Sequence, residues 1–88
     1  MVQVIENRAD LTGHVLSVAE HEKLAGHARA VIAVEAISAV DGYANMFGTA
    51  VGSRLEVVVA STRARGLRVG DEVRLRIRRA GPSTVFGE

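Results

Sequence analysis

Residues 72–79 read EVRLRIRR, and this stretch decides the fold class. Three apolar residues alternate strictly with three arginines: Val73, Leu75 and Ile77 with Arg74, Arg76 and Arg78. Successive side chains of a β-strand point to opposite faces of a sheet, so a period of two predicts a strand with one buried and one cationic face. The chain is therefore predicted to be a β protein with a row of arginines on its surface.

The remaining strands are predicted from four runs of apolar and β-branched residues, which favour a pleated sheet over a helix. These runs are 11–18, 28–37, 54–60 and 83–86. Gly13, inside the first run, indicates a bulge or a close approach of another backbone. The break at Gly81 and Pro82 separates the arginine strand from the last run.

The connections between these runs have the composition of loops and turns. Residues 19–27 predict a long hairpin loop, and Asp41–Gly42 and Gly70–Asp71 predict turns. Residues 60–67, ASTRARGL, predict one or two turns of helix, capped by Ser61 or Thr62 and ended by Gly66.

This order of elements predicts one mainly β domain over residues 1–88. Three strands, a short helix and two strands are the order of a small five-stranded barrel of the oligonucleotide/oligosaccharide-binding (OB) type, with the helix between strands 3 and 4. Closing the sheet into a barrel also removes the unpaired edges that an open sheet would leave.

Composition excludes several classes of function. The chain has 88 residues, no cysteine and a formal net charge of +1, so thiol catalysis, disulfides and cysteine zinc sites are excluded. No run approaches the roughly 20 apolar residues that cross a bilayer, and the start lacks the pattern of a signal peptide. We expect a cytoplasmic protein with no membrane contact. Because so small a core supplies little net stability, we also expect a homo-oligomer.

Residues 43–51 hold two of the three aromatic residues in what otherwise reads as a connection. Five apolar residues here follow helical spacing: Tyr43, Met46, Phe47, Ala50 and Val51. The pattern predicts a second short helix. Tyr43, Met46 and Phe47 would then either plug one end of the barrel or form a subunit interface.

The first strand carries a motif that resembles a known family. Arg8, Leu11, Gly13 and Val15 match Ser-Ala-Arg-Asn-x-Leu-x-Gly-x-Val, whereas Glu6 stands in the place of the serine. With the later stretches LEVVV, GLRVGDEV and STVF, this pattern resembles the small molybdate-binding Mop/TOBE barrels, which are oligomeric domains of the OB type.

The resemblance implies a non-enzymatic binding or assembly module that holds a small, molybdate-like oxyanion at a subunit interface. The ligand-binding residues it implies are Arg8, Thr12, Arg63 and Arg65. Two alternatives stay open: a single-stranded nucleic acid binder, and a purely structural protein that associates with itself.

The nucleic acid alternative depends on the arginine strand, that is, on Arg74, Arg76, Arg78 and Arg79. Alternate side chains of a strand are about 6.6–6.8 Å apart, which is on the order of the spacing of backbone phosphates. No aromatic residue alternates with these arginines in the sequence, although single-strand binders stack bases on aromatic rings. Salt bridges to Glu20, Glu22 or Glu35 are the competing explanation for the row.

No catalytic or metal site is predicted. His14, His21 and His27 are the only imidazoles, and HEKLAGH lacks the spacing of the zinc motif HExxH. No motif marks a nucleophile or a pair of acid–base carboxylates. We therefore expect a protein that is not an enzyme.

Overall fold

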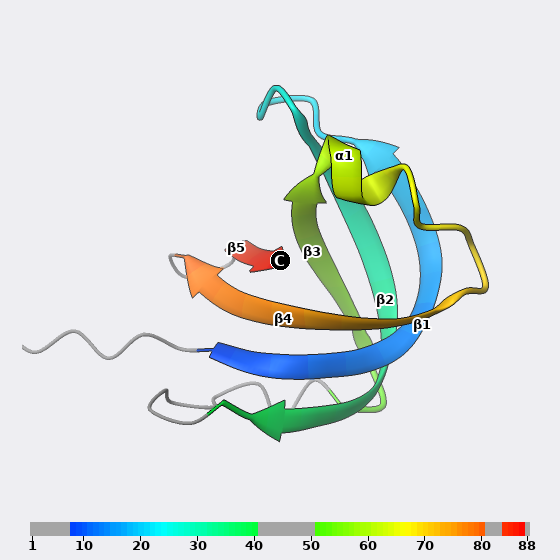
Figure 1. Ribbon diagram of the computed structural model, residues 1–88, viewed down its shortest axis with the longest axis vertical. Coiled ribbons are helices and arrows are strands. Elements are labelled where there is room, and N and C mark those ends of the chain that lie inside the picture. The colour runs from blue at the N-terminus through cyan, green and yellow to red at the C-terminus, as the bar shows by residue number, and fades with distance from the viewer. Residues whose placement is uncertain (1–7, 41–50, 81–83, 88) are drawn as a thin grey trace, which may run out of the picture.

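The computed structural model of the chain describes residues 8–40, 51–80 and 84–87. The elements in chain order are β1 (Arg8–Glu20), β2 (His27–Ala39), β3 (Arg54–Ala60), α1 (Ser61–Ala64), β4 (Glu72–Ala80) and β5 (Thr84–Gly87). The strands close into a barrel in the order β1-β2-β3-β5-β4, in which only the β3–β5 pair is parallel (Figure 1). This confirms the predicted all-β architecture, a small OB-like barrel with a short helix between β3 and β4.

The barrel interior is filled by the apolar residues that alternate along each strand. Leu11 and Val15 of β1, Ile32 of β2, and Leu75 and Ile77 of β4 are at most 1% exposed. The alternating arginines of β4 point outward, as the period of two predicts. The inward faces also contain several alanines and valines, so a small core needs no large aromatic side chain.

Gly13 lies where the pairing of β1 with β2 shifts register, as its position in the sequence predicts. A Cβ at this position would overlap the carbonyl oxygen of Ala33, so no larger residue fits while the two backbones stay this close. A second register shift lies between Val15 and Ser17. The two irregularities increase the local bend of β1, which closes the barrel.

β1 and β2 are longer than their apolar runs predicted. Both strands have 13 residues, because their backbone pairing continues from Ala9 opposite Ala39 to Glu20 opposite Ala28. The ends of this hairpin carry exposed side chains, so hydrophobic periodicity does not reveal them. The loop between the two strands is correspondingly shorter than the predicted 19–27.

The predicted side-chain cap of the helix is wrong. Ala60 is the N-cap residue of α1, and no side chain caps the helix, which has only four residues. The Ser61 N–H instead donates a backbone hydrogen bond to the Gly26 carbonyl, and Ala64 is buried. Contacts with the rest of the barrel therefore position α1, at the end of the barrel where the β1–β2 loop also lies (Figure 1).

The predicted turn before β4 is confirmed. Gly70 has a φ of 92°, and its N–H donates to the Val15 carbonyl, while the Val15 N–H donates to the Asp71 carbonyl. The turn at 41–42 and the aromatic cluster of Tyr43, Met46 and Phe47 lie outside the described residues. So does the helix predicted over 43–51, apart from Val51, which lies in a turn. Within the described part of the chain, no helix is long and apolar enough to cross a membrane.

Candidate functional site

A row of cross-strand partners crosses the outer face of the barrel, and we call it the outer row. It consists of Arg29 (β2), Val58 (β3), Phe86 (β5), Arg78 (β4) and Arg8 (β1), each the register partner of the next. Neighbouring strands are 4.7–4.9 Å apart, so about 14 Å separates the backbone of Arg29 from that of Arg78. An aromatic ring therefore lies on the surface between arginines from two different strands.

Phe86 lies against Arg78 on the outer face of the barrel. The Arg78 guanidinium carbon lies 4.7 Å from the centre of the Phe86 ring, the geometry of a cation–π contact. The His27 ring meets the same phenyl group edge-on, with 6.4 Å between centroids and 74° between planes. Phe86 is half-buried. No aromatic residue alternates with the arginines within β4, but the neighbouring strand β5 places one against Arg78.

The alternation along β5 explains why Phe86 faces outward. Val85 is buried, and a Cβ on Gly87 would meet the side chains of Val57 and Val59 in the core. Since residues 85 and 87 face the interior, Phe86 must face solvent. The sequence contained this signal, because an antiparallel hairpin around residue 82 places Phe86 directly opposite Arg78.

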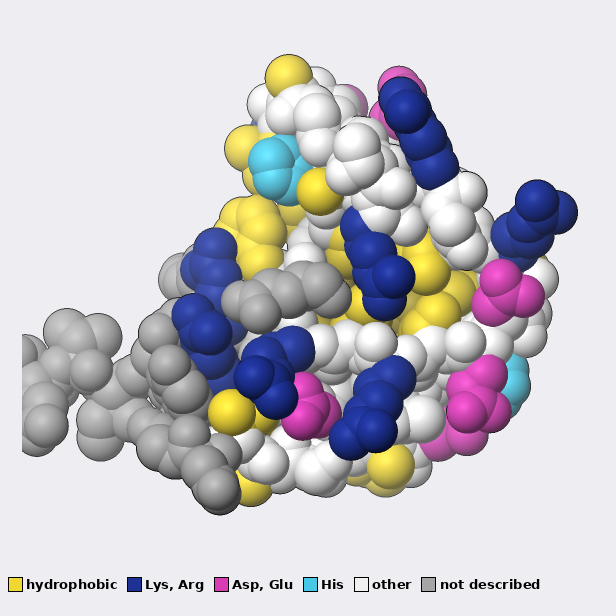
Figure 2. All heavy atoms as spheres, in the orientation of Figure 1, with side chains coloured by type: hydrophobic (Ala, Val, Ile, Leu, Met, Phe, Trp, Pro, Cys, Tyr) yellow, Lys and Arg dark blue, Asp and Glu magenta, His cyan; other side chains and the backbone are white. Residues whose placement is uncertain are grey.

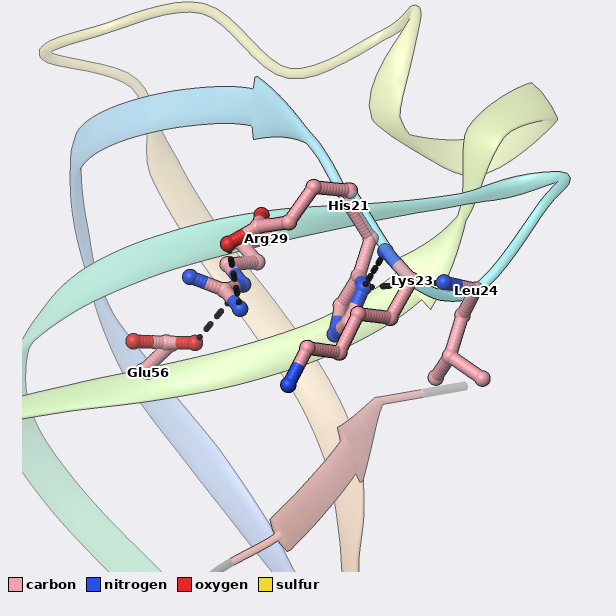
Figure 3. Close-up of polar contacts among 6 residues, drawn as sticks. His21, Lys23, Leu24, Arg29 and Glu56 are labelled. Carbon is pink, nitrogen blue, oxygen red and sulfur yellow. Dashed lines mark hydrogen bonds and ion pairs between the residues drawn. The ribbon is translucent and has the colours of Figure 1, made fainter.

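A groove of about 510 Å³ opens beside the outer row, under the β1–β2 loop. Its lining combines cations, one carboxylate and apolar side chains: His21, Lys23, Leu24, Arg29, Glu56, Val58, Thr84 and Val85. Figure 3 shows His21, Lys23 and Leu24 of the loop beside β3, with Arg29 on β2 and Glu56 on β3. The volume lies within the range of small-ligand pockets. Sequence reasoning missed this groove, because its residues come from three strands and a loop.

Arg29 is held between two carboxylates inside this groove. Its NH2 atom lies 3.1 Å from Glu22 Oε1, and its Nε atom lies 3.3 Å from Glu56 Oε1. The backbone N–H of Glu22, and next the positive charge of Arg29, lower the pKa of the Glu22 carboxyl. Arg29 is thus paired with two acids while part of its surface remains exposed (Figure 3).

The β1–β2 loop is ordered by His21. Its Nδ1 accepts hydrogen bonds from the backbone N–H groups of Lys23 and Leu24, each at 3.0 Å. The two backbone N–H groups converge on one nitrogen of the ring, so a local side-chain contact closes this part of the loop. The His21 N–H donates to the His27 carbonyl, and Gly26, at a φ of 76°, completes the turn. The loop therefore has a defined shape over the groove.

The β1–β4 side of the barrel is different in character. Arg76 donates to both carboxylate oxygens of Asp10, with 3.0 Å from Nε to Oδ1 and 3.4 Å from NH2 to Oδ2. The hydrogen bond from Arg76 is the main reason that the pKa of Asp10 is lowered. Arg74 is exposed opposite Thr12, and Arg79 is exposed opposite Val85. The outward arginines of β4 therefore have unlike surroundings.

Two of the three acids expected as partners of the arginine strand, Glu22 and Glu35, contact other residues. Glu22 pairs with Arg29, and Glu35 contacts His14 Nδ1. The acid that contacts Arg76 is Asp10, its direct register partner. Figure 2 shows acidic side chains between the Lys and Arg side chains on the face that it presents. Charges of both signs are thus interspersed there.

The predicted oxyanion-binding residues lie in two separate places in the described chain. Arg8 and Thr12 are on the β1–β4 side, opposite Arg78 and Arg74. Arg63 is in the last turn of α1 and Arg65 follows as its C-cap. Arg65 lines a smaller cavity, of about 240 Å³, with the far end of β1 from Val18 to Glu20. Ten residues of β1, about 33 Å of strand, separate Arg8 from Val18.

The three histidines have separate local roles. His14 contacts Glu35, His21 orders the loop, and His27 contacts Phe86. In the described ranges, no group of three or more His, Asp or Glu residues is placed to hold a metal ion.

No protein-family model, curated protein or solved structure matches this chain.

Proposed function

We propose that this protein binds single-stranded nucleic acid across the outer row and the adjoining groove. The observation that carries the proposal is the guanidinium of Arg78, 4.7 Å from the centre of the half-buried Phe86 ring on the outer face of the barrel. Single-strand binders combine a cationic track for the backbone with aromatic rings on which bases stack. Arg78 and Phe86 supply both elements at one point of the surface.

The position of the groove supports the same function. OB barrels bind oligonucleotides on the face of strands 2 and 3 and with the loop between strands 1 and 2. Arg29 and Glu56 belong to those strands, and Lys23 belongs to that loop. The outer row leads from this groove to Phe86 in two strand spacings, about 10 Å. A single strand bound along the row would contact the groove and the ring with neighbouring nucleotides.

Oxyanion binding in a cytoplasmic homo-oligomer, as the Mop/TOBE resemblance implies, is the alternative. Arg8 and Thr12 lie far along β1 from Arg63 and Arg65, so a site with all four requires residues from a second subunit. Native mass spectrometry separates the two functions. A symmetric oligomer that retains a tetrahedral oxyanion would favour the alternative over nucleic acid.

The proposal is tested by fluorescence anisotropy with labelled 15-mers of single-stranded DNA and RNA, and with a duplex of the same length. We expect the single strands to bind more tightly than the duplex, because a base stacks on Phe86 only when it is unpaired. Three phosphate contacts would give a slope of about −2 for log K against log salt. Equal affinity for the duplex would contradict the proposal.

Phe86→Leu is the decisive variant. Leucine keeps an apolar side chain on β5 but removes the flat ring, so affinity for the single strand should fall about tenfold. Val69→Ala is the matched control, because Val69 is 70% exposed and lies in the loop before β4, outside the row and the groove. Thermal unfolding checks that both variants are folded. If Phe86→Leu binds as well as the wild type, the ring has no role in binding.

A further inference from the structure

The groove differs from the rest of the outer row in its charge. Two cations, Lys23 and Arg29, line the groove together with the carboxylate of Glu56, and a second carboxylate, Glu22, pairs with Arg29 from outside the lining. The groove is therefore close to neutral, whereas the row on its other side, at Arg78, is cationic. A phosphate gains little by entering a neutral groove, so the part of a nucleotide suited to it is the base.

Glu56 lines the groove, and its carboxylate can accept hydrogen bonds from a bound base. Its Oε1 contacts Arg29 Nε, and its side chain is 54% exposed. Among the described residues, Oε2 has no hydrogen-bond partner. An ionised carboxylate has about four lone-pair sites, so Glu56 accepts from a ligand without giving up Arg29. Val58 and Leu24 supply apolar contacts for the faces of a ring.

The carboxylate of Glu56 beside the guanidinium of Arg29 complements guanine better than the other bases. The Watson–Crick edge of guanine presents two adjacent donors, N1–H and N2–H₂, beside the acceptor O6. Adenine and cytosine present one donor group next to acceptors, and thymine presents one N–H between two carbonyls. A carboxylate beside a guanidinium therefore complements guanine, with Glu56 accepting from the two donors and Arg29 donating to O6.

We propose that the groove accepts one base of the bound strand and prefers guanine there, read by Glu56 and Arg29. The inference rests on the proposed function and specifies its ligand. Val58, which lines the groove, is the register partner of Phe86. The base in the groove and the base on Phe86 therefore belong to neighbouring nucleotides, one read by hydrogen bonds and one held by stacking.

The test uses labelled single-stranded 9-mers of dT in which the central base is dT, dA, dC or dG. We expect the dG oligomer to bind about tenfold more tightly than the dT oligomer, since a bidentate contact discriminates to roughly this degree. Glu56→Gln should reduce that preference to less than twofold. Glu72→Gln is the control, because it removes the same charge from an exposed residue opposite His14, outside the groove.

A second measurement does not depend on any variant. Inosine in the central position keeps N1–H and O6 but lacks the N2 amino group, so it should lose at least threefold of the guanine preference. Equal binding of all four oligomers overturns the inference, and so does a guanine preference that survives in Glu56→Gln or with inosine. Failure to bind any oligomer overturns the proposed function itself, so the two failures are distinguishable.

Discussion

The two sides of this barrel use the same residue type in different ways. On the β1–β4 side, Arg76 is engaged by a carboxylate of the neighbouring strand. On the β3–β5–β4 side, Arg78 lies over a phenyl ring, and beyond it Arg29 lines a groove. Arg76 and Arg78 are two residues apart and point in the same direction from β4. Their surroundings differ because different residues of β1 and β5 lie opposite them.

Whether an arginine on a strand can bind a ligand depends on the residue that lies opposite it. A guanidinium that already donates to a carboxylate is less available to a phosphate or a base, whereas one stacked on an aromatic ring keeps its N–H edge exposed. The number of arginines on a strand is therefore a weaker guide to a binding surface than the partner opposite each one. Substitutions of these arginines and of the residues that set the strand register can test this distinction.

Gly13→Ala should disturb the pairing of β1 with β2, and with it the register that places Asp10 opposite Arg76. The new Cβ would overlap the Ala33 carbonyl oxygen and lie 2.9 Å from Ile32 Cγ2, so the two strands must move apart. We expect the free energy of unfolding to fall by about 2–3 kcal/mol in urea denaturation. Gly87→Ala is the matched variant. The three atoms nearest to its Cβ belong to the side chains of Val57, Val59 and Leu75 rather than to backbone, so it should cost about 1 kcal/mol. The reverse order would show that β1 can adjust its register.

Arg78→Ala and Arg76→Ala test the comparison directly. Arg78→Ala removes the guanidinium over Phe86, and we expect affinity for single-stranded DNA to fall about tenfold in anisotropy titrations. Arg76→Ala removes the same charge, but its guanidinium is engaged by Asp10, so the loss should be less than threefold. Arg78→Lys should be intermediate, because lysine keeps the charge and loses the planar stack. Equal losses for the two alanine variants would mean that only total charge matters.

Asp10→Asn should have a small effect that depends on pH. The pKa of Asp10 is lowered by Arg76, so its ionised form stabilises the fold above the ordinary value of about 3.9. This contribution is lost as pH falls through the lowered pKa. Because the pair is partly exposed, the variant should lose a few tenths of a kcal/mol at pH 7, measured in urea, and this difference should disappear in strong acid. A loss that persists at pH 2 would point to packing rather than charge.

The strands could be predicted from the sequence because their signal is local. EVRLRIRR shows its buried and exposed faces through alternation alone, and the same holds for the core residues of β1, whereas in β3 the consecutive Val57, Val58 and Val59 are all buried. The ends of β1 and β2 could not be predicted, since exposed residues there are held by backbone pairing. The helix cap was mispredicted because the barrel, through Gly26, determines where α1 begins.

The sequence could predict the Arg78 and Phe86 part of the candidate site but not the groove. Arg78 follows from the alternation of β4, and Phe86 could have been paired with it by extending the hairpin around residue 82. The groove could not be predicted from the sequence in this way. Arg29 and Glu56 are 27 positions apart in the chain and meet only because β2 and β3 pair in one particular register, under a loop that His21 holds in place.

The sequence by itself determined that this protein is a β barrel with a cationic strand, because the period of two and the turn residues act over a few neighbours. Only the tertiary structure decided which arginine meets a carboxylate, which meets a ring and which lines a groove. Those contacts depend on register and on barrel closure, and the register shift at Gly13 is set by two backbones that are distant in the chain.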